Sequence, residues 1–147
     1  MILVILITMK RVLVFGTFDV IHKGHEYFLK QAKRYGNFLV AVVTRDINVK
    51  KQKGYIPVNS EKVRLRNIKK LKLVDKTLLG EKKISYKLIE KLKPDVICIG
   101  YDQRPKIAET KKILNNLGMK KVILRKIKAY KPTIYKSSLF QKRFKRT

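Results

Sequence analysis

The chain has 147 residues, 45% of them hydrophobic, and this length and apolar content predict one folded domain over residues 1–147 and exclude a disordered tail. Its only cysteine, Cys98, excludes an intrachain disulfide and a cysteine zinc site, which fits a reducing cytoplasm. A net charge of +27 predicts an anionic partner such as a nucleotide, a phosphorylated metabolite or RNA, without saying which.

The first eight residues, MILVILIT, are apolar but too short to span a membrane, and they lack the basic region and cleavage site of a signal peptide. We therefore expect no membrane role. Met9 begins MKRVLVFG, which reads as the start of a strand. Residues 1–8 are expected to be an N-terminal extension or to lengthen that strand.

Apolar runs and helical patterns alternate along the rest of the chain. The runs rich in Val, Ile and Leu predict strands at residues 11–16, 38–44, 73–80, 95–100 and 121–127. The patterns of helical period lie at about residues 24–36, 60–71, 83–92, 105–117 and from about 136. This alternation predicts an α/β fold with a single parallel sheet covered by helices on both faces.

Ligands of such open sheets bind at the carboxyl ends of the strands. Three polar segments fall at those ends here: GTFDVIHKGH, TRDINVKKQKG and GYDQ. They contain both histidines of the chain and a dense lysine cluster, so we expect the functional site at this edge.

The two histidines, His22 and His25, lie three residues apart between a strand and a helix. Gly16 permits a tight turn at the strand end, and Gly24 permits close approach of the helix backbone to a ligand. A helix N-terminus favours phosphate, and two imidazoles spaced this way can donate hydrogen bonds to one oxyanion. The pattern indicates charge stabilisation at a phosphorus centre.

Two further interpretations of the histidine pair stay open. The histidines could be a structural capping pair, or they could bind a metal together with Asp19. The chain offers no further histidine or usable cysteine to complete a zinc site.

Several segments in order resemble the HxGH nucleotidyltransferases, which include the cytidylyltransferases and the archaeal FAD synthases. The resemblance covers Met9 to about Gln103 well and the last third loosely. Its motifs are GTFD, HKGH, TRDINVKKQKG, IPVNSEKVR, LVDKTLLG and KPDVICIGYDQ, the last three of which are most similar to the archaeal FAD synthase branch.

The resemblance implies a Rossmann-like fold and transfer of AMP from ATP to FMN, which gives FAD and pyrophosphate. CTP-dependent transfer to glycerol 3-phosphate or a related alcohol phosphate is the alternative, so the choice between ATP and CTP and the acceptor stay open. A Mg²⁺ ion, or another divalent cation, is expected on the phosphates with few protein ligands. Family members often form dimers, although no interface pattern stands out in this sequence.

The resemblance also implies roles for particular residues. His22 and His25 would hold α- and β-phosphate oxygens, and Lys51 and Lys53 the triphosphate or the acceptor phosphate. The expected nucleotide-binding residues are Gly16, Thr17, Phe18, Asp19, Gly24, Arg64, Asp102, Ser137 and Ser138, and no protein metal ligand is expected. In simpler structural roles, Arg64 would be a surface charge paired with Glu61, and Asp102 would only cap a helix.

The sequence departs from the family pattern at three places. Lys23 occupies the variable position of HxGH, where its side chain can point to solvent. Lys72 stands where cytidylyltransferases carry an arginine, which weakens that interpretation. Late in the chain, a family arginine is missing and Lys131 is a candidate substitute for it, so the acceptor contacts are the least defined.

A nucleic-acid-binding module is the lower-ranked alternative, suggested by the charge. The chain has no RNP-like, helix-turn-helix or zinc-knuckle pattern. Its lysines are spread along its whole length, as on a solvated surface. We expect at most a nonspecific affinity for nucleic acid that weakens with salt.

Overall fold

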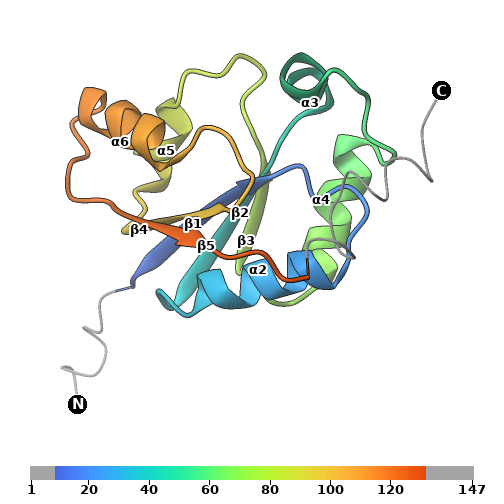
Figure 1. Cartoon of the computed structure of the whole chain (residues 1–147), viewed down its shortest axis with the longest axis horizontal. Helices are drawn as coiled ribbons and strands as arrows, with labels where there is room; N and C mark the ends of the chain where they lie inside the picture. The colour runs from blue at the N-terminus through green and yellow to red at the C-terminus, as the bar shows by residue number, and fades with distance from the viewer. Residues whose placement is uncertain (1–8, 132–147) are drawn as a thin grey trace.

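The computed structural model describes residues 9–131, drawn in colour in Figure 1. The predicted extension at residues 1–8, the predicted last helix from about residue 136, and the predicted site residues Ser137 and Ser138 lie outside the described residues.

Five parallel strands form one sheet in the order β3-β2-β1-β4-β5, which confirms the predicted α/β, Rossmann-like fold. β1 and β4 are neighbours although two strands separate them in the sequence. Successive strands are therefore added to one side of β1 up to β3 and to its other side from β4 on. Ligands of such folds bind at the point where this order changes. The strands are β1 (Arg11–Gly16), β2 (Phe38–Val43), β3 (Lys76–Leu79), β4 (Val96–Gly100) and β5 (Ile123–Ile127).

Helices cover both faces of the sheet, as the sequence predicts (Figure 1). One face packs against α2 (Lys23–Lys33) and α4 (Glu61–Lys70), and the other against α5 (Lys87–Leu92) and α6 (Ile107–Asn116). The two cores follow from the period of two in each strand, because alternate side chains point to opposite faces. Val12 and Val14 face α2, whereas Leu13 between them faces the other layer.

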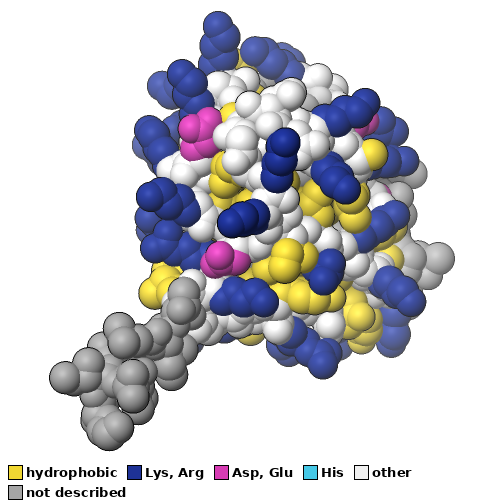
Figure 2. Space-filling view, turned by 90° about the vertical axis from the view of Figure 1, so that its left-hand side faces the viewer, with side chains coloured by type: hydrophobic (Ala, Val, Ile, Leu, Met, Phe, Trp, Pro, Cys, Tyr) yellow, Lys and Arg dark blue, Asp and Glu magenta, His cyan; other side chains and the backbone are white. Residues whose placement is uncertain are grey.

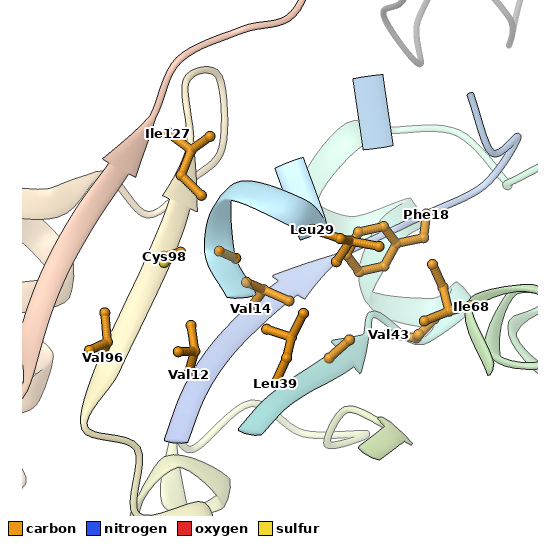
Figure 3. Close-up of a cluster of buried hydrophobic side chains, with 12 residues drawn as sticks. Val12, Val14, Phe18, Leu29, Leu39, Val43, Ile68, Val96, Cys98 and Ile127 are labelled. Carbon is orange, nitrogen blue, oxygen red and sulfur yellow. The ribbon is translucent and has the colours of Figure 1, made fainter. Parts of the chain in front are cut away.

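The core on the α2 side is a continuous apolar layer (Figure 3). Leu29 of α2 and Ile68 of α4 pack there against side chains of β1, β2 and β4. Cys98 lies in the same layer, 1% exposed, and burial raises the pKa of its thiol to about 12. Cys98 is therefore a small core residue.

Two helices differ from the predicted pattern. The segment TRDINVKKQKG contains a helix, α3 (Asp46–Lys53), where the sequence pattern indicates only a polar strand end. The only apolar residues of α3 are Ile47 and Val49, so its sequence lacks the apolar periodicity by which a helix is predicted. The predicted helix at 83–92 begins only at Lys87, because Tyr86 has a left-handed backbone with φ of 63°.

β3 is shorter than the predicted strand at residues 73–80. The side chain of Asp75 accepts the Leu39 N–H at 2.7 Å, and ladder pairing with β2 runs from Lys76 to Leu79. Leu73 and Val74 pack into the core before the strand begins.

Basic side chains are frequent on the surface that Figure 2 shows. Figure 2 shows Lys and Arg over the whole of one face, with apolar side chains between them and few acidic ones. In the described part of the chain, no helix is both long enough and apolar enough to span a bilayer.

Candidate active site

The two histidines build the N-terminus of α2. His22 is the N-cap residue, and its Nδ1 accepts the Gly24 N–H at 3.0 Å. The Nδ1 of His25 accepts the His22 N–H at 3.2 Å. This is a reciprocal capping box in which imidazoles replace the usual hydroxyl and carboxylate. The capping interpretation of the pair is therefore correct.

Capping also fixes which ring nitrogen of each imidazole carries the proton. A neutral imidazole has one acceptor nitrogen and one N–H donor. Since both Nδ1 atoms accept backbone N–H groups, both rings carry their proton on Nε2. Each ring thus keeps an Nε2–H donor on the side away from the atom that caps the helix, so capping and phosphate binding are compatible roles.

The surroundings keep both histidines neutral near pH 7. The rings lie against each other, with centroids 3.9 Å apart and their planes tilted by 33°. Burial, together with the neighbouring His22 and Lys53, lowers the pKa of His25 to about 3. Burial also lowers the pKa of His22. Two neutral N–H donors can bind an anion without first losing or gaining a proton.

The turn between β1 and α2 is tightly packed. Phe18 has a left-handed backbone, φ 49°, and its ring is 4% exposed and meets His25 edge-on at 5.8 Å between centroids. A Cβ atom at Gly16 would lie 2.6 Å from the Phe18 ring. Glycine is therefore required at position 16 by the ring that folds back over it.

Lys53 at the end of α3 reaches this turn. Its ammonium donates a hydrogen bond to the Thr17 hydroxyl at 3.2 Å. The surrounding protein keeps part of the water away from this ammonium, which lowers the pKa of Lys53, while the charge of Asp102 raises it and that of Arg64 lowers it. Lys51 is two residues earlier, which places it on another side of the helix, and it is exposed and does not line the pocket.

A pocket of about 750 Å³, partly open to solvent, brings most of the predicted residues together at the carboxyl ends of β1, β4 and β5. Its walls come from the β1–α2 turn, the N-terminus of α2, the end of α3 and the segments after β4 and β5. The predicted site residues that line it are Gly16, Thr17, Phe18, His22, Gly24, His25, Lys53 and Asp102.

Asp19 and Arg64 lie behind the pocket instead of lining it. The Asp19 carboxylate, 1% exposed, accepts the N–H groups of Val58 and Asn59 at 2.7 and 2.8 Å. It therefore fixes the loop that follows α3. The structure does not bring these oxygens to the pocket wall.

Arg64 is completely buried and holds three segments together. Its guanidinium donates to the carbonyl oxygen of Thr17 at 2.7 Å, to the carbonyl oxygen of Asn59 at 3.0 Å and to the Asp46 carboxylate at 2.8 Å. The interpretation as a surface charge paired with Glu61 is wrong, because Glu61 pairs with Arg45 at 3.0 Å. Arg64 supports the site through the backbone of the turn.

Asp102, Lys23 and Lys72 also have defined positions in the structure. The N-cap of α6 is Lys106, so Asp102 is not its cap. Lys23 is exposed, as expected for the variable position of HxGH. Lys72 is exposed and lies outside the lining of the pocket.

Part of the pocket was not predicted from the sequence. Tyr101 and Gln103 line it beside Asp102, and Lys128 to Tyr130 close the side beyond β5. Tyr130 stacks on Tyr27 of α2 with ring centroids 5.0 Å apart. The position of residues 128–130 directly after a predicted strand was the signal that could have identified them.

The pocket suits a metal ion that is coordinated by the phosphates of a bound nucleotide better than one that is coordinated by protein side chains. Among residues 9–131, no group of three or more His, Cys, Asp or Glu side chains could hold a metal ion. Asp102 is the one carboxylate among the described residues lining the pocket. The metal interpretation with Asp19 gains no support, because Asp19 does not line the pocket that the two histidines share and its carboxylate holds the backbone of Val58 and Asn59.

Comparison with known proteins gives consistent matches over most of the chain. The family model described as cytidylyltransferase-like matches residues 13–143. FAD synthase from Pyrococcus abyssi is 41% identical over 134 residues, which are 90% of each chain. FAD synthase from Ferroglobus placidus is 43% identical over 80% of this chain and 76% of its own.

A solved structure agrees with these sequence matches. The crystal structure of a lipopolysaccharide core biosynthesis protein from Thermoplasma volcanium superposes with a TM-score of 0.78 at 40% identity. The match covers 84% of this chain and 99% of that one. The resemblance drawn from the motifs is confirmed.

Proposed function

Since this chain belongs to the cytidylyltransferase-like family, we propose that it is a nucleotidyltransferase that transfers AMP from ATP to FMN, giving FAD and pyrophosphate. The FAD synthase relatives at about 40% identity cover most of both chains and support this reaction. The observation that carries it is the adjacent pair of neutral imidazoles, each with an Nε2–H donor, that lines one pocket together with Lys53.

The reaction is an in-line displacement at phosphorus. An oxygen of the FMN phosphate attacks the α-phosphorus of ATP and forms the new P–O bond. The bond from the α-phosphorus to the bridging oxygen of the β-phosphate breaks, and pyrophosphate leaves with that electron pair. No covalent enzyme intermediate is needed, so catalysis rests on positioning and charge stabilisation.

The pocket residues have complementary roles in this proposal. His22 and His25 donate their Nε2–H groups to α- and β-phosphate oxygens as negative charge develops there. Lys53, positioned by the Thr17 hydroxyl, neutralises charge between the triphosphate and the incoming phosphate. Asp102 and the segment from Lys128 to Tyr130 are assigned to the ribose and base end.

A divalent cation such as Mg²⁺ accompanies the triphosphate in this proposal and supplies charge neutralisation. It would be held mainly by phosphate oxygens and water, because Asp102, the one carboxylate among the described residues lining the pocket, is assigned to the ribose and base end. The donor set of the pocket fits this mode of binding.

The remaining predicted residues fall into two groups. Some support the pocket without touching the substrates in this proposal, and the others remain sequence-based predictions. Asp19 and Arg64 act by holding the loops around the nucleotide, and Lys51 remains a sequence-based prediction. Ser137 and Ser138 also remain predictions, as does a homodimer. CTP and glycerol 3-phosphate are the competing substrates that an assay must separate from ATP and FMN.

The test is pyrophosphate release in the presence of Mg²⁺, with ATP or CTP crossed with FMN, glycerol 3-phosphate or phosphocholine. We expect release with ATP and FMN, with FAD identified by chromatography. Release only with CTP and an alcohol phosphate would replace this proposal with the cytidylyltransferase alternative. Omission of the divalent cation is expected to stop release, and undiminished release with a chelator would contradict the role given to it.

A further inference from the structure

Lys53 has the surroundings of a reactive amine. Its Nζ atom lies 3.2 Å from the Thr17 hydroxyl, which holds the side chain at the turn between β1 and α2. The surrounding protein keeps part of the water away from this group and so lowers the pKa of Lys53. A larger fraction of this amine is therefore neutral at a given pH than of an ordinary lysine, and the neutral amine is the nucleophile.

The same pocket offers donors for a phosphate group next to this amine. Gly24 and the two histidines line it at the N-terminus of α2, together with Lys53. The positive charge of Lys53 is one of the causes that lower the pKa of His25, so the two side chains are close to each other. A helix N-terminus and imidazole N–H groups bind phosphate oxygens. A phosphorylated molecule bound there therefore has Lys53 beside it.

Two neighbouring lysines do not share this position. Lys50 and Lys51 belong to the same helix as Lys53 and are exposed, but neither of them lines the pocket. The three lysines of α3 thus have the same sequence surroundings and differ in their access to bound phosphate. Lys128 also lines the pocket, from the segment after β5, whereas Lys53 is bonded to the turn that leads into the histidines.

We propose that Lys53 is a site of direct acylation by acyl phosphates, small molecules in which a phosphate is joined to an acyl carbon. The phosphate group binds at the N-terminus of α2, and the Lys53 amine attacks the acyl carbon. The new N–C bond forms, the C–O bond to phosphate breaks, and phosphate leaves with that electron pair and takes up the proton of the amine. No further reactant is needed.

This inference rests on the proposed function for the binding of phosphate in the pocket, and it adds a modification that would control the site. Acylation removes the positive charge of the lysine. Since Lys53 neutralises charge between the phosphates in the proposed reaction, the acylated protein should lose turnover. ATP and acyl phosphates would compete for the same donors, so a protein occupied by ATP would be protected.

The test is the rate of acetylation at each lysine of α3 when the full chain is incubated with acetyl phosphate. Cleavage before Asp46 and before Glu61 releases one peptide that contains Lys50, Lys51 and Lys53, so mass spectrometry compares the three sites within one molecule. We expect the initial rate at Lys53 to exceed that at Lys51 at least about 5-fold. Equal rates at the two lysines would overturn the inference.

Three controls separate capture of the phosphate from reactivity of the amine alone. Inorganic pyrophosphate should slow acetylation of Lys53 and leave Lys51 unchanged, because it competes for the phosphate donors. Acetic anhydride carries no phosphate, so the preference for Lys53 over Lys51 should be at least about 3-fold smaller with it. His22→Asn keeps the cap of α2 and should slow acetylation at Lys53 only. An undiminished preference for Lys53 in all three controls would overturn the inference.

The failure of this inference can be distinguished from failure of the proposed function. If the protein makes FAD and acetyl phosphate modifies Lys51 as fast as Lys53, the inference fails and the function stands. If Lys53 is acetylated selectively and no FAD is formed, the phosphate site stands and the function fails. The expected result is FAD formation that falls in step with the acetylated fraction of Lys53 and is preserved when ATP is present during the acetylation.

Discussion

At the scale of residues, the proposed function gives each of two imidazoles two tasks. In each ring Nδ1 takes part in the capping box, and the proton that this leaves on Nε2 makes that nitrogen a hydrogen-bond donor. The two tasks use different atoms, so substitutions can separate them. Asparagine is a good N-cap residue, and glutamine is a usual partner at the third helical position of a capping box.

His22→Asn is expected to lower turnover roughly 100-fold, because it removes one donor to the developing oxyanion. The melting temperature should stay close to that of the unaltered protein, since asparagine can still cap α2. Turnover is followed by FAD formation and stability by thermal unfolding. Full turnover in this variant would refute the role of the Nε2–H group.

His25 should make the fold sensitive to mild acid. Its pKa is about 3 in the folded protein and about 6.5 in the unfolded chain, so between these values the unfolded state binds more protons. The free energy of unfolding therefore falls as pH is lowered, by about 2 kcal/mol from pH 7 to pH 5. Urea unfolding at the two pH values measures this, and His25→Gln should show a clearly smaller difference.

Lys53 and Lys51 form a natural comparison, because both belong to α3 but only Lys53 lines the pocket. Lys53→Met is expected to lower kcat roughly 100-fold through loss of a charge beside the reacting phosphates. Lys51→Met should have a much smaller effect. Steady-state kinetics with ATP and FMN measure both, and a larger effect at Lys51 would show that the helix presents its other side to the substrate.

At the scale of elements, α3 and α4 cap each other. The Asp46 N–H donates to the Glu61 carboxylate at 3.1 Å, and the Glu61 N–H donates to the Asp46 carboxylate at 3.3 Å. Arg64 joins this pair to the β1–α2 turn through the Thr17 carbonyl oxygen. The position of Lys53 relative to the histidines is therefore set by contacts between the ends of helices.

Arg64→Met should destabilise the protein by about 3 kcal/mol, because it leaves buried acceptors at three segments without their donor. Arg66→Met, two positions along the same helix at an exposed side chain, is the control and should change stability by less than about 0.5 kcal/mol. Denaturant unfolding measures both. Similar stability of the two variants would contradict the role of Arg64 as the tie.

At the scale of the whole molecule, the net charge is +27, and on the face drawn in Figure 2 the Lys and Arg side chains are spread over the surface. Such a surface attracts polyanions without selecting a sequence, and salt screens that attraction. In the proposed function, catalysis would depend instead on a few neutral and charged donors in one pocket. Affinity for nucleic acid and enzymatic turnover should thus respond differently to salt.

Binding of a short RNA is expected to weaken at least about 10-fold between roughly 50 and 200 mM salt, with little dependence on its sequence. FAD formation at saturating substrates should change by less than about 3-fold over the same range, because screening acts mainly on exposed charges. Filter binding and the FAD assay measure the two. A sequence-specific RNA complex that survives high salt would revive the nucleic-acid-binding alternative.

Strand and helix periodicity in this sequence was sufficient to predict the layers of the fold. The Val-rich runs of β1, β2 and β4 are buried on both faces of the sheet. Continuous apolar runs of this kind are typical of parallel strands that helices cover on both sides. α3 was not predictable in the same way, since it buries little apolar surface and its bounds depend on the reciprocal caps with α4. The delayed start of α5 likewise depends on one left-handed residue, Tyr86.

The sequence by itself determined the α/β fold, the edge of the sheet that carries the site, and the histidine pair, because these follow from periodicity and from residue types at a strand-to-helix turn. Only the tertiary structure decided which basic residues reach that site. It brings Lys53 to Thr17, buries Arg64 behind the turn and opens a second pocket beside Gln103. Side-chain direction depends on contacts between segments far apart in the chain, and local sequence does not encode those contacts.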